Sequence, residues 1–184
     1  IDILIFALQL EAGSYPTSYI PTMGVSQTRA NEDAIISSAS NIIDITQGTL
    51  FIDCTIDSNV NNEIYLMKFD GVNFSDTLYL YRSALGFIKG VYRIGNVTYE
   101  SQNISVSGKF KAAFGYDSNN DCALYVNGAK VGVSFNIPTP SVSLTAIRLG
   151  GFNASLAKQS GLTHQSLYFP TALTDSEAIA LTTI

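Results

Sequence analysis

Short runs in which apolar and polar residues alternate dominate this sequence, and clusters of Gly, Asn, Asp and Ser separate them. A period of two is typical of β-strands that bury one face. In TLFIDCTI, for example, Leu50, Ile52, Cys54 and Ile56 fall on one side of the predicted strand. Further strands are predicted in EIYLMKFDG, TLYLYR, GFIKGVYRI, FKAAFGY, CALYV, LTAIRLGG and HQSLYF.

The turn signals between these runs predict antiparallel pairing. Asn127 and Gly128 lie between two alternating runs, which favours a two-residue type I′ hairpin turn, and Gly95 followed by Asn96 suits a type II′ turn. Near the end, Thr174 and Glu177 form a T-x-x-E capping box, so one short helix is expected there. Many short strands with one terminal helix predict an all-β antiparallel sandwich or jelly roll.

Composition limits the partners of this domain. The chain has 184 residues, 46% of them hydrophobic and 14% charged, which is enough apolar material for one domain to fold alone. Its net charge of -5 has the wrong sign for nucleic acid or an anionic membrane. The apolar run of residues 1–10 is too short to span a bilayer and lacks the features of a signal peptide. Cys54 and Cys122 are expected to be buried free thiols.

Several segments carry a family resemblance. The stretch QLEAGSYPTSYIPTMGVSQTRANED (residues 9–33) resembles a junction in tail-fibre and other structural proteins of bacteriophages and prophages, where it precedes a concanavalin A-like, laminin-G-like sandwich. The pieces ALYVNG, IRLGG and SLYFPTALTDSEAIALT resemble the hairpin, the penultimate strand and the closing strand and helix of that sandwich. The resemblance implies a concanavalin A-like jelly roll.

The same resemblance suggests how the chain is divided. Residues 1–12 are expected to be a terminal strand left from an upstream domain, residues 13–40 a junction with the first strands, and residues 41–184 the sandwich itself. The resemblance also implies a place in the virion tail, outside the cell when the protein acts, with other virion subunits as partners, a homotrimer of this chain among them.

A catalytic site is not expected. A glycoside hydrolase needs two carboxylates flanking one bond, and Asp53 with Asp57 is the one acidic pair at a suitable strand spacing. Asp57 falls at a strand end, where an aspartate is ordinary turn chemistry. His164 is the sole histidine, and no G-x-S-x-G motif surrounds any serine, so it is interpreted as an exposed or hydrogen-bonded residue at a strand edge.

Two binding sites are candidates. Tyr79 and Tyr81 share a strand face on which the next strand can present Lys89 and Arg93, a combination suited to stacking and hydrogen bonding a sugar. The alternative is that these tyrosines belong to the rim or core of the sandwich.

The loop from residue 117 to 121 offers Asp117, Asn119 and Asp121 as oxygen ligands for calcium. An Asx-rich turn without an ion is the favoured alternative there, so no cofactor is expected unless calcium binds.

Three functions are compatible with these features. The leading hypothesis is a non-enzymatic module of a phage tail fibre or tailspike-like protein that binds a host surface polysaccharide. The second is a virion structural or oligomerisation module without a ligand, and the third is a polysaccharide depolymerase. Fold alone does not decide among them.

Overall fold

The computed structural model describes residues 25, 34–56, 63–72, 75–141, 143–150 and 161–184. The chain divides into two units, Ile1–Glu32 and Asp33–Ile184, and of the first only Val25 is described. The predicted end strand and most of the predicted junction, together with Asp57, therefore lie outside the described residues.

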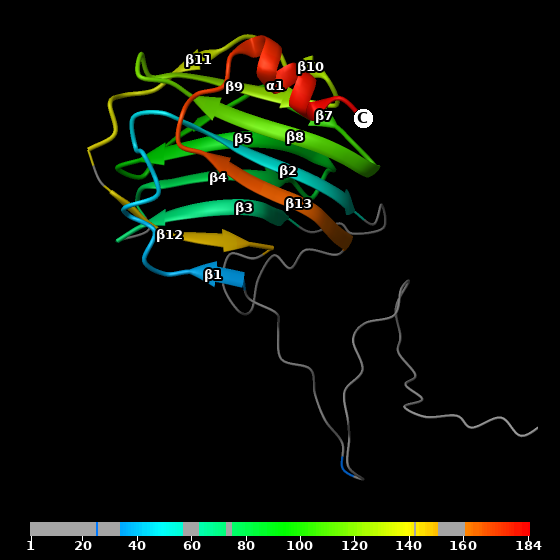
Figure 1. Cartoon of the computed structure of the whole chain (residues 1–184), viewed down its shortest axis with the longest axis horizontal. Helices are drawn as coiled ribbons and strands as arrows, with labels where there is room; N and C mark the ends of the chain where they lie inside the picture. The colour runs from blue at the N-terminus through cyan, green and yellow to red at the C-terminus, as the bar shows by residue number, and fades with distance from the viewer. Residues whose placement is uncertain (1–24, 26–33, 57–62, 73–74, 142, 151–160) are drawn as a thin grey trace, which may run out of the picture. The chain divides into compact units, whose positions relative to one another are not determined.

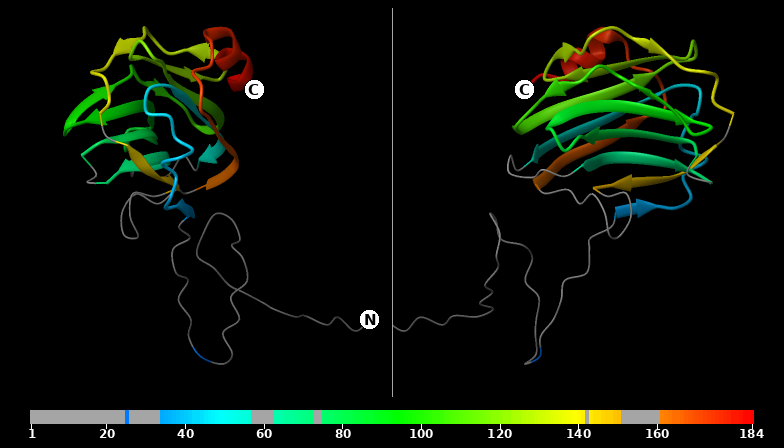
Figure 2. Two further views of the ribbon diagram at one scale, coloured as in Figure 1. Left: turned by 60° about the vertical axis from the view of Figure 1, so that its left-hand side comes forward. Right: turned by 180° about the vertical axis from the view of Figure 1, so that it is seen from behind.

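The second unit is a sandwich of two antiparallel sheets, which form two layers in Figures 1 and 2. In sheet order, sheet A consists of β1 (Ala34–Ile36), β12 (Leu144–Leu149), β3 (Ile64–Gly71), β4 (Thr77–Arg82), β5 (Phe87–Ile94) and β6 (Val97–Glu100), with β7 (Ile104–Ser105) also paired to β5. Sheet B consists of β10 (Ala129–Lys130), β9 (Asp121–Val126), β8 (Gly108–Tyr116), β2 (Gly48–Ile56) and β13 (Gly161–Phe169), with β11 (Phe135–Asn136) also paired to β9. The predicted all-β antiparallel sandwich is confirmed.

The core lies between the two sheets, and the alternation of the sequence explains it. The four apolar residues of β2 singled out above all point inward and are buried. They meet buried residues from β3, β4, β5 and β8, among them Phe69, Leu78, Leu80, Ile88, Phe110 and Phe114. Burying each such side chain contributes about 1.5–3 kcal/mol before entropy is counted. Cys54 and Cys122 are free, buried thiols in this core, as predicted.

A glycine allows the two sheets to approach at the centre of the sandwich. Gly90 of β5 faces the ring of Phe114 from β8, and a Cβ built on Gly90 would lie 2.7 Å from the ring carbon Cε2 and closer still to two other ring carbons. Carbon atoms pack at about 3.5–4.0 Å, so the ring occupies the space that any other side chain would need.

A short helix, α1 (Asp175–Thr182), packs on the outer face of sheet B. Its capping box is present as predicted, because Thr174 accepts a hydrogen bond from the backbone of Glu177 and the Glu177 carboxylate accepts one from the backbone of Thr174. A second, smaller apolar cluster joins the helix to the sheet through Phe51, Ala113, Tyr125 and Ala178. Among the described residues, no helix has the length and apolar character needed to cross a membrane.

Both predicted hairpin turns form, and one differs in type. Asn127 and Gly128 have φ values of 50° and 78°, which confirms the type I′ turn between β9 and β10. Gly95 and Asn96 have φ values of 56° and 69°, so the turn between β5 and β6 has positive φ at both central residues and is not type II′. Asparagine tolerates the left-handed region, and the Asn96 side chain is held by a hydrogen bond from Arg93.

Candidate functional site

The four residues predicted to form a sugar site lie together on the outer face of sheet A. Tyr79 and Tyr81 of β4 point away from the core, while the leucines between them point into it. In β5, Lys89 is directly opposite Tyr81, and Arg93 lies on the same face, two residues beyond Val91, which is opposite Tyr79. The structure thus brings all four to one surface, and their role in binding stays a prediction.

A third tyrosine joins this face through a β-bulge in β3. Tyr65 is paired with Tyr81, and Lys68 is paired with Tyr79. In a regular strand, residues three apart face opposite sides, but the register shifts around Leu66 and puts both on the outer face. We call Tyr65, Tyr79 and Tyr81 the tyrosine cluster. Its ring centroids lie 5.2 to 5.9 Å apart, within the range of favourable aromatic contacts.

A buried charge network lies beside the tyrosine cluster. The Lys68 ammonium contacts the Asp70 carboxylate at 2.5 Å, and Arg148 of β12 donates to the other Asp70 oxygen at 2.7 Å. Lys68 is only 1% exposed although it lies on an outer face, and its ammonium is 5.7 Å from the centroid of the Tyr65 ring. Burial lowers the pKa of Lys68, and the Asp70 carboxylate opposes that change. The network holds the side chains of Lys68, Asp70 and Arg148 in place beside the tyrosine cluster, because breaking a buried ion pair costs about 3–5 kcal/mol.

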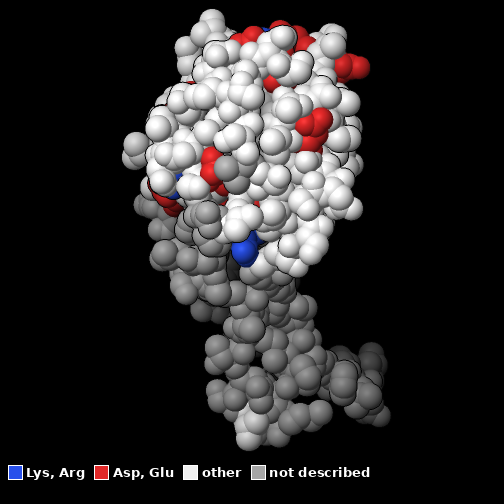
Figure 3. Space-filling model, turned by 90° about the vertical axis from the view of Figure 1, so that its left-hand side faces the viewer, with Lys and Arg blue, Asp and Glu red and all other residues white. Residues whose placement is uncertain are grey.

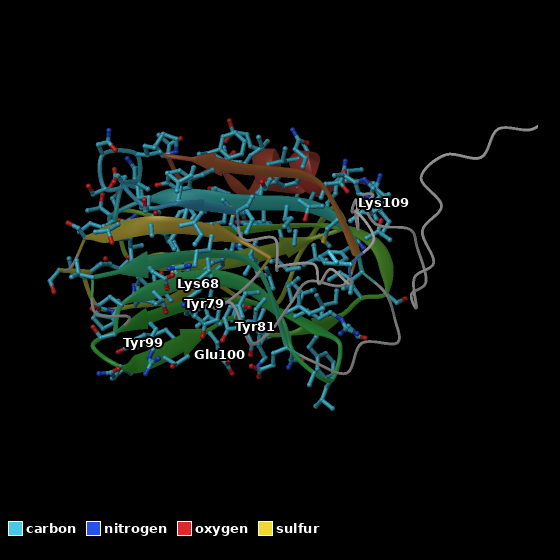
Figure 4. The ribbon with its side chains drawn as sticks, turned by 90° about the horizontal axis from the view of Figure 1, so that it is seen from below. Lys68, Tyr79, Tyr81, Tyr99, Glu100 and Lys109 are labelled. Carbon is cyan, nitrogen blue, oxygen red and sulfur yellow. The ribbon has the colours of Figure 1, made fainter. Side chains whose placement is uncertain are left out.

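The two cations from β5 have different partners. Lys89 donates to Glu100 of β6 at 2.9 Å, and this hydrogen bond raises the pKa of Lys89. Arg93 donates from one terminal nitrogen to Asn96 at 3.0 Å, but its Nε is buried and has no hydrogen-bond partner among the residues that the structure describes. Figure 4 shows Glu100 with Lys68, Tyr79 and Tyr81 in one region of the molecule, whereas Lys109 of sheet B lies apart from them.

The phenol groups of the tyrosine cluster stay protonated at neutral pH. Burial raises the pKa of Tyr65 and of Tyr79, and the nearby Arg93 guanidinium only partly opposes that rise. Burial also raises the pKa of Tyr81. Each hydroxyl can therefore both donate and accept a hydrogen bond, beside apolar ring edges and a guanidinium. Such a surface can hold a polar ring compound.

Sequence reasoning missed Tyr65, Lys68, Asp70, Arg148 and Glu100 as members of this face. Strict alternation puts Tyr65 and Lys68 on opposite faces, because they are three residues apart. The bulge that reverses this has no turn residue to mark it. A lysine and an aspartate within an otherwise apolar strand were the available signal, because buried charges in a strand need partners nearby.

The predicted calcium loop is organised by its own hydrogen bonds. Oδ1 of Asp117 accepts from the backbone N–H groups of Asn119 and Asp121, both at 2.9 Å, and Oδ2 accepts from the Asn119 amide at 3.3 Å. This is an Asx turn, and Asn120 in it has a φ of 66°. In the described part of the chain, no three or more acidic, histidine or cysteine side chains are grouped to hold a metal ion. Calcium at this loop stays a prediction.

The residues weighed for catalysis lie on sheet B. His164 is exposed on the edge strand β13, and its Nε2 is 2.9 Å from Oγ1 of Thr55, as the strand-edge interpretation expected. Asp53 points to the outer face, where Lys109 lies 3.9 Å from one of its oxygens. The pairing of Asp53 with Asp57 cannot form part of the described site, since Asp57 lies outside the described residues.

Comparison with known proteins shows the fold. No family model matches the chain, and no curated protein matches it. Among solved structures, the Ruminococcus gnavus IT-sialidase CBM40 has a TM-score of 0.65 at 18% identity, over 85% of this chain and 99% of that one. The same CBM40 bound to α2,3 sialyllactose has a TM-score of 0.61 at 20% identity, over 85% of this chain and 98% of that one.

A longer protein contains the same sandwich. The NanB sialidase from Streptococcus pneumoniae has a TM-score of 0.66 at 16% identity, and the match covers 84% of this chain but only 27% of the sialidase. At these identities the likeness establishes the sandwich fold of this chain.

Proposed function

We propose that this domain is a non-catalytic carbohydrate-binding module whose ligand lies on the outer face of sheet A, across the tyrosine cluster. The observation that carries the proposal is the arrangement of three phenol rings in mutual contact beside the guanidinium of Arg93. Sugars present C–H faces to aromatic rings and hydroxyls to polar side chains, so both kinds of contact are available here.

The similar structures support this proposal. Structures of the Ruminococcus gnavus CBM40 bound to α2,3 and to α2,6 sialyllactose share the sandwich fold, and the match spans nearly the whole of those chains. Two of the acidic side chains near the tyrosine cluster, Asp70 and Glu100, are held in ion pairs, which favours binding over acid–base catalysis.

Within this proposal the ligand carries an acidic sugar. Arg93 is partly exposed on this face, and among the described residues one of its terminal nitrogens has the neutral amide of Asn96 as its partner. Counting the charged side chains that act on the tyrosine cluster and its buried network, four cations stand against three carboxylates, a local charge of +1 in a chain whose net charge is -5: Lys68, Lys89, Arg93 and Arg148 against Glu63, Asp70 and Glu100. A carboxylate on the sugar can pair with the Arg93 guanidinium, and hydrogen bonds between charged partners are the strong ones.

Calorimetric titration with 3′-sialyllactose, and with lactose as the neutral comparison, tests the proposal. We expect binding to the sialylated sugar, and a loss of about 10- to 100-fold in affinity for Arg93→Ala, the value of a charge-assisted hydrogen bond of about 1.5–3 kcal/mol. Tyr81→Ala should lose about 2- to 10-fold, the value of an aromatic contact.

Lys109→Ala is the matched control, because it removes an exposed cation from the other sheet, and it should bind like the unchanged protein. Equal affinity for lactose would exclude the acidic sugar and leave carbohydrate binding standing. Absence of binding to any sugar on a glycan array, with and without calcium, would refute the module itself.

The wider setting rests on the sequence resemblance of residues 9–33. It supports a tail fibre or tailspike-like protein of a phage or prophage, located in the virion tail and acting outside the cell on a host surface polysaccharide. Self-association, as a homotrimer or with other virion subunits, is tested by light-scattering mass over a range of protein concentrations. Release of reducing ends from a bacterial polysaccharide would instead favour a depolymerase.

A further inference from the structure

A hollow of about 290 Å³ lies on the outer face of sheet B, on the opposite sheet from the proposed sugar site. Its floor is Gly115 of β8 and Ala123 of β9, which are paired directly in register and both face away from the core. Leu173 and Thr174, in the segment that enters α1, form one wall. The hollow therefore exists because Gly115, which has no side chain, is paired with Ala123, which has only a methyl group.

Backbone geometry does not require a glycine at this position. A Cβ on Gly115 would have Oγ1 of Thr49 at 3.6 Å as its nearest neighbour, which is an ordinary contact, and Gly115 does not have the positive φ that favours glycine. The missing side chain is therefore space that the fold could fill without strain. Thr49 itself is fixed beneath this segment, since it accepts a hydrogen bond from the backbone of Leu173 at 3.0 Å.

The polar lining of the hollow is acidic. Asp117, Asp121 at the start of β9, and Asp175 at the start of α1 are among its lining residues. Among the described residues, the cation in contact with these carboxylates is Lys130, so the local charge of three carboxylates and one ammonium is -2. In Figure 3 acidic side chains predominate at the upper end of the molecule, the end that carries α1 and β9 in Figure 1. Such a lining favours a cationic ligand.

The protein already holds an alkylammonium at this rim. The Nζ of Lys130 lies 2.9 and 3.1 Å from the two oxygens of Asp175, and it is 5.8 Å from the centroid of the Tyr125 ring. The hydroxyl of Tyr125 donates to the same carboxylate at 2.6 Å, which orients it. A carboxylate beside an aromatic ring is a favourable environment for a primary ammonium.

The Asp121 carboxylate, in the lining of the hollow, has an oxygen that can accept a further hydrogen bond. Oδ1 of Asp121 is 3.4 Å from the Asn136 amide, whereas its Oδ2 has no hydrogen-bond partner within the described residues. Asp117 lies next to it, because its Oδ1 accepts the backbone N–H of Asp121.

We propose that this hollow binds a small primary amine with a short aliphatic chain. The ammonium would lie at Asp117 and Asp121, and the chain would cross the floor of Gly115 and Ala123 toward Leu173. This assignment is independent of the sugar site, because the two surfaces are on opposite sheets and share no residue.

Titration of the backbone amide NMR signals with n-butylamine, and with 1-butanol as its uncharged counterpart, tests the assignment. We expect saturable shifts at Gly115, Ala123 and Ser134 with the amine, and at least tenfold weaker binding of the alcohol. Gly115→Leu fills the hollow and should abolish saturation. Tyr81→Ala, on the other sheet, should leave the amine affinity unchanged.

Asp121→Asn keeps the shape of the hollow and removes one charge from an exposed side chain, so it should weaken the amine at least threefold. The Asp121→Asn variant tests amine binding even if Gly115→Leu does not fold. Equal binding of amine and alcohol, undiminished binding in Asp121→Asn, or shifts confined to other residues would overturn the proposal. Calcium chloride that reproduces the amine shifts at lower concentration would overturn it in favour of a metal site.

Discussion

Replacing Gly90 with alanine should destabilise the sandwich, although a glycine in a strand is ordinarily a weak point. The new methyl group would lie 2.7 Å from Cε2 of Phe114 and closer to two further ring carbons, so the ring must retreat by about 1 Å or more to reach normal contact distance. Phe114 is fully buried, and β8 is paired on both sides, so the ring has little room to move. Overpacking of this kind costs about 1–3 kcal/mol.

Alanine also has fewer backbone conformations than glycine in the unfolded chain, which stabilises the folded state by about 0.4–1 kcal/mol and offsets part of that cost. We therefore expect a net loss of about 1.3 kcal/mol for Gly90→Ala, which lowers Tm by about 3–5 °C in a domain of this size. Urea denaturation followed by circular dichroism measures the free energy, and calorimetry measures Tm.

Gly115→Ala is the matched control, since it lies one residue from Phe114 and its Cβ has a nearest neighbour at 3.6 Å. It should be unchanged or slightly more stable. Phe114→Leu in the Gly90→Ala background should recover part of the loss, because the smaller side chain leaves room for the methyl group. If Gly90→Ala is as stable as Gly115→Ala, the two sheets do not meet at this point as described.

Three further predictions concern the turn, the helix and the first residues. Gly128→Val should cost about 1–3 kcal/mol in urea denaturation, because a β-branched residue is strained at a φ of 78°, and an unchanged midpoint would contradict the hairpin. Tyr125 and Lys130 lower the pKa of Asp175, so its contribution to stability is complete above the unfolded value of 3.8 and is lost as pH falls below it. The stability advantage over Asp175→Asn should therefore shrink on acidification from pH 6 to pH 3, and a constant difference would argue against the ionic contact. A chain that begins at Ser14 should stay folded and become more soluble or more monomeric, whereas aggregation would place the removed residues in the core.

Much of the fold could be predicted because apolar and polar residues alternate in the sequence wherever the strands are regular. The inward set of β2, the type I′ turn at Asn127 and Gly128, and the capping box of α1 all depend on residues close together in the chain. The turn at Gly95 was misassigned in type because Asn96 can adopt a positive φ, which a two-residue pattern does not reveal.

The candidate site was only half predictable for a different reason. Tyr79, Tyr81, Lys89 and Arg93 belong to one hairpin, so alternation placed them on the same face. Tyr65 and Lys68 reach that face through a bulge, and Arg148 reaches Asp70 from a strand 78 residues away. The hollow on sheet B was not foreseen, because it arises from the pairing of two small residues and from a helix that packs beside them.

The reactivity of the two free thiols, Cys54 and Cys122, reports how often the strands around them separate. Cys54 lies on β2, which is paired on both sides, and burial raises its pKa to about 12, while Cys122 lies at the start of β9 and burial raises its pKa as well. A thiol reagent attacks the thiolate, so neither sulfur reacts until its strand separates from its neighbours. The rate at which each cysteine is modified therefore measures how often its part of the sandwich opens, without any added label, and comparing the two rates separates the opening of β9 from that of β2.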